Sequence, residues 1–135
     1  MLKNLSSLAI ILVLLTGLAP LSATAEVAPD AARIVVYRAD ESSRTQKVKF
    51  KVQLNQESQG RLKYNRTLVV TPAAGAYELG ISLKGAEPLS IDLKPGQTYY
   101  VHTKIRQRGT RLIPELVLVE EQLAVSQQPS IGQLI

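Results

Sequence analysis

The sequence predicts an all-β fold, and three observations support this prediction. Apolar and polar residues alternate along several short stretches, which is the period of a half-buried strand. Glycine and proline separate these stretches at intervals of roughly 8–12 residues, a spacing typical of β-sandwiches. Between residues 26 and 119 no segment has a helical period. We therefore expect an antiparallel β-sandwich of about seven or eight strands, with immunoglobulin-like or transthyretin-like architecture.

The expected strands follow one another closely along the chain. In chain order they cover residues 32–38, 48–54, 61–63, 67–70, 77–83, 89–93, 98–105 and 111–119. The first is a continuous β-branched run, typical of a buried strand, whereas the second alternates strictly. Residues 55–60 and 94–97 are expected turns, and Pro114 predicts an edge strand or a bulge. The central core residues should be Val52, Leu79, Ile81 and Ile91.

The first 25 residues have the pattern of a secretory signal peptide. Lys3 supplies the positive charge, residues 8–15 form the apolar run, and Ala23-Thr24-Ala25 is a small-residue cleavage pattern. An uncleaved anchor is the alternative, because the stretch after Lys3 is uncharged and long enough to span a bilayer. Pro20 and the cleavage pattern interrupt the apolar run, so we expect cleavage and a periplasmic or secreted protein without a stable membrane anchor.

The composition limits both the architecture and the chemistry. The 135 residues include 16 Lys and Arg, 11 Asp and Glu, one His and no Cys. The length fits one domain, so we expect a signal peptide over 1–25, a sandwich over 26–121 and a tail over 122–135. The tail should form a short helical turn followed by loose chain. Without cysteine there can be no disulfide, thiolate metal site or lipidated N-terminal cysteine.

Four stretches, in this order and spacing, form a recognisable set. They are Ala32 to Arg38, Pro72-x-x-Gly75-x-Tyr77-x-Leu79 with Ser82 to Gly85, Lys94-Pro-Gly-Gln-Thr-Tyr-Tyr100, and Leu116 to Glu121. Together they resemble the bacterial exported domain of unknown function 2846 family, and the middle also resembles PEGA-type and carboxypeptidase-regulatory-like sandwiches. This resemblance implies a small envelope β-sandwich, often a lipoprotein, with no catalytic residues to assign. The chain departs from it by lacking a lipobox cysteine and by having Asn55 to Ser58 where a hairpin glycine is usual.

The residues give little support for catalysis or for a cofactor. His102 is the single histidine, so multi-histidine metal centres are excluded. Ser42 and Ser43 lie in a charged loop without an identifiable base, and no Gly-x-Ser-x-Gly occurs. Glu120 and Glu121 are neighbours that point to opposite faces if they continue a strand. We expect no enzyme, no cofactor and no metal site.

A basic stripe is the strongest candidate for a functional surface. If Tyr99, Val101, Thr103 and Ile105 point inward, the opposite face of that strand carries other residues, and Arg111 lies nearby. The candidate residues are Tyr100, His102, Lys104, Arg106, Arg108 and Arg111. The stripe could contact an anionic envelope polymer or an acidic protein partner; the alternative is a solvated strand face that blunts a sheet edge. We expect a binding or structural module of the bacterial cell envelope, and export argues against nucleic acid.

Overall fold

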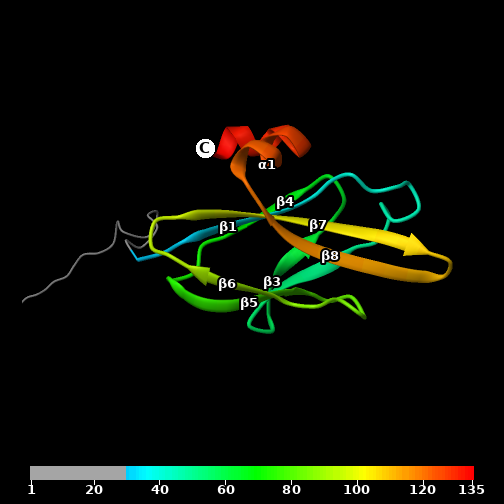
Figure 1. The fold of residues 1–135 in the computed structure, drawn as a ribbon, viewed down its shortest axis with the longest axis horizontal. Coiled ribbons are helices and arrows are strands. Elements are labelled where there is room, and N and C mark those ends of the chain that lie inside the picture. Colours follow the sequence, from blue (N-terminus) through cyan, green and yellow to red (C-terminus); the bar gives the residue numbers. More distant parts are fainter. Residues whose placement is uncertain (1–29) are drawn as a thin grey trace, which may run out of the picture.

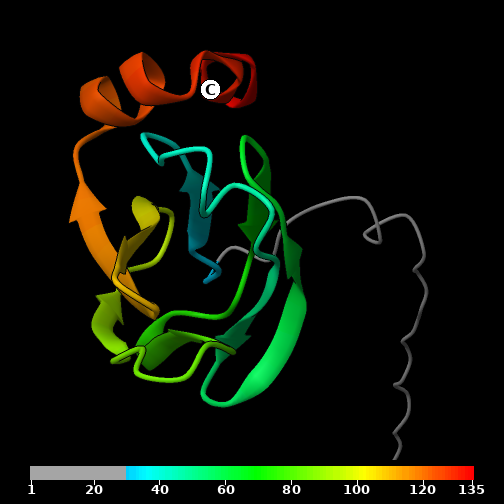
Figure 2. The ribbon, with the colours of Figure 1, turned by 90° about the vertical axis from the view of Figure 1, so that its right-hand side faces the viewer.

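The computed structural model describes residues 30–135, which form a sandwich of two four-stranded sheets (Figures 1 and 2). The strands are β1 (Arg33–Arg38), β2 (Phe50–Leu54), β3 (Glu57–Leu62), β4 (Thr67–Val70), β5 (Gly75–Ile81), β6 (Leu89–Leu93), β7 (Thr98–Arg108) and β8 (Arg111–Val119). One sheet has the order β4-β1-β7-β8 and the other β3-β2-β5-β6. The predicted β-sandwich is therefore confirmed. The predicted signal peptide, residues 1–25, lies outside the described residues.

One strand pair departs from the expected antiparallel arrangement. β1 and β7 run parallel, with Ile34 opposite Tyr99, whereas the other pairs of the described strands are antiparallel. The wholly antiparallel sandwich is thus corrected. The physical reason is that the chain makes two excursions into the other sheet, through β2 and β3 and then through β5 and β6, before β7 returns beside β1. A crossover of this length can join parallel neighbours.

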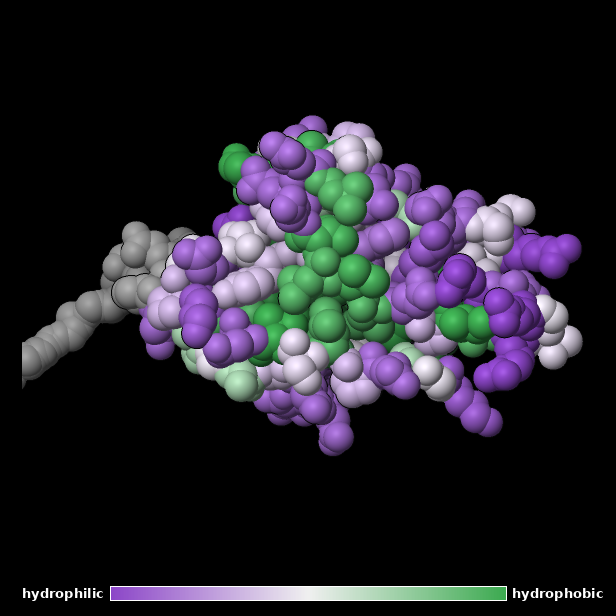
Figure 3. Space-filling view, viewed as in Figure 1, coloured by the Kyte–Doolittle hydropathy of each residue, from purple (hydrophilic) through white to green (hydrophobic). Residues whose placement is uncertain are grey.

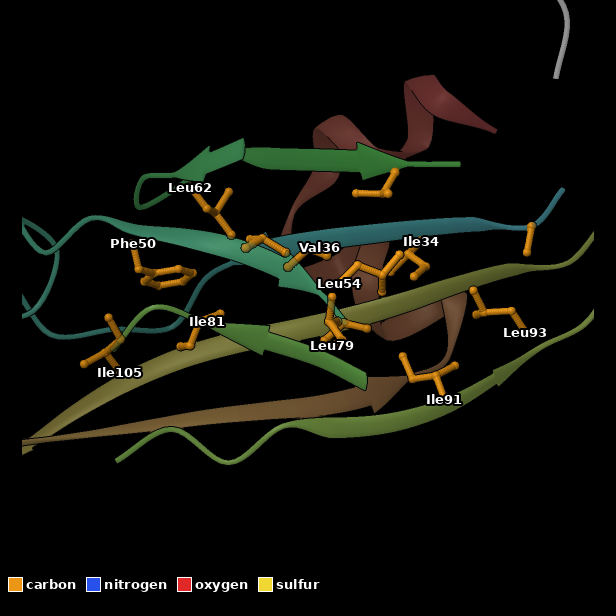
Figure 4. Close-up of a cluster of buried hydrophobic side chains, with 14 residues drawn as sticks. Ile34, Val36, Phe50, Leu54, Leu62, Leu79, Ile81, Ile91, Leu93 and Ile105 are labelled. Atoms are coloured by element: carbon orange, nitrogen blue, oxygen red, sulfur yellow. The ribbon is translucent and has the colours of Figure 1, made fainter. Parts of the chain in front are cut away.

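The core lies between the two sheets and follows the predicted alternation. Fourteen buried apolar side chains from both sheets meet there (Figure 4). The four residues predicted to be central are confirmed, since Val52 and Leu79 are fully buried and Ile81 and Ile91 nearly so. Pro114 lies on β8, which is an edge strand, so the edge prediction is also confirmed.

The turn between β2 and β3 is shorter than predicted. Only Asn55 and Gln56 separate the two strands, and both have positive φ, 51° and 70°. Positive φ at both central residues is the type I′ geometry that matches the twist of a hairpin. Residues 57–60, predicted as turn, therefore belong to β3.

A buried ion pair holds the long loop after β1. Arg38 is completely buried, and its Nε and Nη2 donate to the two carboxylate oxygens of Glu41 at 2.9 and 2.7 Å. Thr45 Oγ1 donates to the same carboxylate, and the Arg38 guanidinium lies 5.0 Å from the Phe50 ring centroid. Residues 39–48 are thus tied to β1, which the sequence analysis did not predict.

The C-terminal segment is folded and covers the outer face of one sheet. It consists of α1 (Glu121–Gln127) and the 3-10 helix η3 (Pro129–Leu134). Ala124 and Ile131 are fully buried against Val35 and Tyr37 of β1. Figure 2 shows the two helices lying over the sandwich beside β1. The predicted helical turn is confirmed, but the loose tail is wrong, because Ile131 completes a second apolar cluster that leaves β1 buried on both faces.

Candidate binding surface

The β7–β8 hairpin extends past the end of β1. β1 pairs with β7 only as far as Thr103, and beyond that point β7 pairs with β8 alone among the described strands. Arg108 faces Arg111 across a two-residue turn in which Gly109 has a φ of 63°. Thr110, the second central residue, does not have positive φ, and positive φ at the first central residue alone is the type II′ geometry, for which glycine is suited. The hairpin tip, residues 106–111, forms the end of the molecule on the right of Figure 1.

Two members of the predicted basic stripe are not exposed. Tyr100 is 6% and His102 8% exposed, although they lie on the face opposite Val101 as predicted. A contact surface needs exposed side chains, so these two residues do not contribute to one. The C-terminal segment covers Tyr100, which packs in the cluster with Ala124 and Ile131. His102 stacks on Tyr37 at 5.1 Å, and its Nε2 lies 2.8 Å from the Ala39 carbonyl oxygen. It has the surroundings of a hydrogen-bonded core histidine.

Two further members of the stripe have carboxylate partners. Lys104 Nζ lies 3.0 Å from Asp40 Oδ2, and Arg106 forms an ion pair with Glu115 of β8. The hydrogen bond and the charge of Lys104 lower the pKa of Asp40 below its ordinary value. These cations are therefore largely compensated within the protein.

Arg108 and Arg111 differ from the rest of the stripe. Both side chains are exposed, and they are direct cross-strand neighbours at the end of the hairpin. Among residues 30–135, neither forms a salt bridge. Like charges directly opposite one another destabilise a strand pair. The basic character of the predicted stripe is thus concentrated at the tip.

The sandwich also has an open side, which the sequence analysis missed. Two adjoining grooves, of about 560 and 530 Å³, lie between edge strand β8 and residues 83–89, which are the loop from β5 to β6 and the first residue of β6. Leu89, Leu116 and Val117 line the first, and Leu83, Lys84 and Arg111 line the second. Figure 3 shows an apolar band on this side, running from below the C-terminal helices across β8. Val117 and Leu118 of β8 are 49% and 42% exposed.

The apolar run Leu116 to Val119 and Pro114 were the only sequence signals of this surface. They indicated an edge strand, but alternation along β8 cannot show which segment of the other sheet lies across from it. That proximity is set by the sandwich topology, in which β8 and β6 are the edges of their sheets on the same side.

Among the described residues, no group of three or more potential ligands for a metal ion occurs. The five grooves described on residues 30–135 do not include His102 in their lining. No helix in this part of the chain has the length and apolarity needed to cross a bilayer. The exposed features of this side of the protein are an arginine tip and an apolar edge.

Comparisons with known proteins show a distant structural likeness. The chain matches no protein-family model and no curated protein sequence. Among solved structures, it is similar to the N-terminal domain of AlgF from P. aeruginosa, with 14% identity and a TM-score of 0.43. The match covers 70% of this chain and all of that domain. The assignment as a β-sandwich rests on the sheets described above.

Proposed function

We propose that this protein is a non-catalytic binding module of the bacterial cell envelope, which contacts an anionic partner through Arg108 and Arg111. The observation that supports this most is the pair of exposed arginines facing each other across the hairpin end without a salt bridge among the described residues. An anion placed between them would offset their mutual repulsion. Arginine binds carboxylates and phosphates through two parallel hydrogen bonds.

The surroundings of His102 support the non-catalytic part of the proposal. A general base must reach a substrate proton, directly or through one water. His102 instead lies beneath the surface, stacked on Tyr37 and bonded to the Ala39 carbonyl. This arrangement stabilises the sheet and leaves little of the imidazole accessible to a bound molecule.

The envelope location rests on the N-terminal sequence. Lys3, the apolar run and Ala23-Thr24-Ala25 form an export signal, and we expect the mature chain to begin at Glu26. Intact mass of the protein recovered from the periplasm tests this. A mass that includes residues 1–25 would contradict cleavage and favour a membrane anchor.

Charge reversal at the tip tests the proposed contact. Wild type and an Arg108→Glu, Arg111→Glu variant are used to recover partners from envelope fractions at low and moderate salt. We expect the wild type to retain a partner whose recovery falls as salt rises, because exposed charges are screened within about 10 Å at 0.1 M. The variant should lose that partner.

The chain offers a matched control on the opposite edge of the sandwich. Arg61 and Lys63 are exposed, and an Arg61→Glu, Lys63→Glu variant makes the same change in net charge. We expect this control to recover the partner as the wild type does, apart from the small general effect of net charge. Equal loss in both variants would show that net charge, and not the tip, determines binding, and equal recovery by all three proteins would eliminate the arginine contact.

A further inference from the structure

The edge of β8 has backbone hydrogen-bonding groups that no described strand uses. β8 pairs with β7 alone. In a hairpin with a two-residue turn, the pair that closes the turn is hydrogen-bonded, and hydrogen-bonded and non-bonded pairs then alternate. Arg111 closes this turn, so the odd-numbered residues of β8 bond to β7 and the even-numbered ones direct their N–H and C=O groups outward.

Pro114 agrees with this assignment. It is even-numbered, so the N–H that proline lacks would have pointed away from β7, and the pairing with Ile105 is undisturbed. Between Pro114 and α1, the outward donors are Leu116 and Leu118. Two adjacent outward positions on one edge can exchange hydrogen bonds with an added strand.

Side chains beside this free edge form an apolar floor. Leu116 and Leu89 line the groove next to the edge, and Leu118 shares the face of Leu116 and remains 42% exposed. A strand added to β8 would place every second side chain over this groove, because alternate residues point to the same face. Apolar residues at those positions would shield Leu89, Leu116 and Leu118 from water.

The charges along the groove differ between its two ends. At the hairpin tip, Lys84 of the loop between β5 and β6 and Arg111 of β8 line the same groove, and neither has a salt bridge among the described residues. Toward α1, the lining includes the carboxylates of Glu87 and Glu115, the latter paired with Arg106. A segment lying along β8 is therefore best matched when its carboxylates are at the tip end.

We propose that β8 binds an extended polypeptide segment of a partner protein by strand addition, with apolar side chains over the groove and carboxylates beside Arg111 and Lys84. This rests on the proposed function and names its partner class. Main-chain hydrogen bonds at Leu116 and Leu118 would supply affinity, and the groove and the cations would select the sequence. The arginine tip and the apolar edge then act as one surface.

Amide hydrogen exchange measured by NMR tests the strand pairing on the full mature chain. The probe is a synthetic peptide of about eight residues, a common strand length, that alternates valine and threonine and ends in two aspartates. We expect the amide protons of Leu116 and Leu118 to exchange at least roughly tenfold more slowly with the peptide, and that of Val117 to be unchanged because it already bonds to β7. A peptide ending in two lysines should protect these protons far less.

Two variants locate the effect. Leu118→Lys places a charge on the edge and should weaken binding of the peptide that ends in aspartates about tenfold, since edge lysines oppose strand pairing. Val69→Lys is the matched control, because Val69 is 40% exposed on β4, the opposite edge of the same sheet. It should bind as the wild type does.

The outcomes separate this inference from the proposed function. Signals that shift at Arg108 and Arg111 without protection of Leu116 and Leu118 would overturn strand addition and leave the arginine contact intact. Equal protection by the lysine peptide would overturn the carboxylate requirement. Protection that rises with protein concentration in the absence of peptide would show a second copy of this chain on the edge, and so overturn a separate partner.

Discussion

At the scale of single residues, the turn after β2 shows how a side chain can support a backbone conformation that non-glycine residues do not favour. Asn55 and Gln56 adopt the left-handed conformation, which asparagine tolerates and glutamine does not. The Asn55 side chain compensates, because its Oδ1 accepts the Glu78 N–H at 2.9 Å while its own N–H donates to the Glu78 carbonyl at 2.8 Å. The cost at Gln56 has no such compensation among the hydrogen bonds of the described residues.

We therefore expect Gln56→Gly to stabilise the protein. Glycine adopts positive φ without the penalty of about 1–2 kcal/mol that other residues incur, and part of this gain is offset by its greater unfolded-state entropy. Urea unfolding should show a net gain of about 0.5–1 kcal/mol. Gln59→Gly, the same change within β3, should instead lose a similar amount, and a loss in both variants would contradict the strain at Gln56.

The Arg38–Glu41 pair is the other residue-scale feature with a measurable consequence. Both side chains are fully buried, so neither charge can be compensated by water. Glu41→Gln would leave the guanidinium buried without its counter-charge, a change that typically costs about 3–5 kcal/mol. Denaturant unfolding measures this loss, with Glu87→Gln at an exposed site as the control. Equal stabilities of the two variants would show that the pair contributes nothing.

At the scale of elements, the C-terminal helices explain why β1 is apolar on both faces. Ile34 and Val36 point into the main core, while Val35 and Tyr37 pack beneath α1 and η3. The segment is attached by polar contacts as well, since the Tyr37 hydroxyl donates to the Gln127 side chain and Arg33 donates to the Leu134 carbonyl. It is part of the folded unit.

A substitution in η3 tests this attachment. Ile131 is fully buried, so Ile131→Ala should cost about 2–5 kcal/mol, the range for truncating a large core side chain to alanine. Leu134, in the same helix, is 40% exposed, and Leu134→Ala should change the free energy of unfolding much less. If both variants have the same midpoint of urea unfolding as the wild type, the segment is not coupled to the sandwich.

The burial of Tyr37 beneath the C-terminal helices predicts that stability depends on pH in the alkaline range. Burial raises the pKa of Tyr37 to about 12, from an ordinary value near 10. The unfolded chain therefore releases this proton first, and stability should fall as pH rises from about 10 toward 12. Tyr37→Phe should remove this part of the fall, which unfolding curves at several alkaline pH values would show. An unchanged fall in the variant would mean that other groups cause it.

How much the sequence could predict depended on the range of the interactions involved. Alternation around Val52, Leu79 and Ile91 is local, and it located the strands and the face that each buries. The stripe on β7 was assigned to the correct face, but alternation cannot show what covers that face. The cover over Tyr100 comes from residues 121–134, and Tyr37 lies 90 positions from its partner Gln127. The groove beside β8 depends on topology in the same way.

At the scale of the whole molecule, the sandwich is closed on one side and open on the other. On the closed side β3 and β4 meet, and Leu68 of β4 lies 3.1 Å from the position that a Cβ on Gly60 would occupy. On the open side the β8 edge, the apolar groove and the arginine tip lie together. A binding partner should therefore approach from this side.

Site-specific photo-crosslinking in cells tests most directly whether a partner contacts the open side. A photoreactive benzoylphenylalanine replaces Gln107 at the hairpin tip in one strain and Ser58 on β3 in another, both at exposed positions. We expect a discrete crosslinked product from Gln107 that is absent from Ser58 and is lost when Arg108 and Arg111 are changed to Glu. The same products from both positions, or none from Gln107, would contradict a partner at this surface.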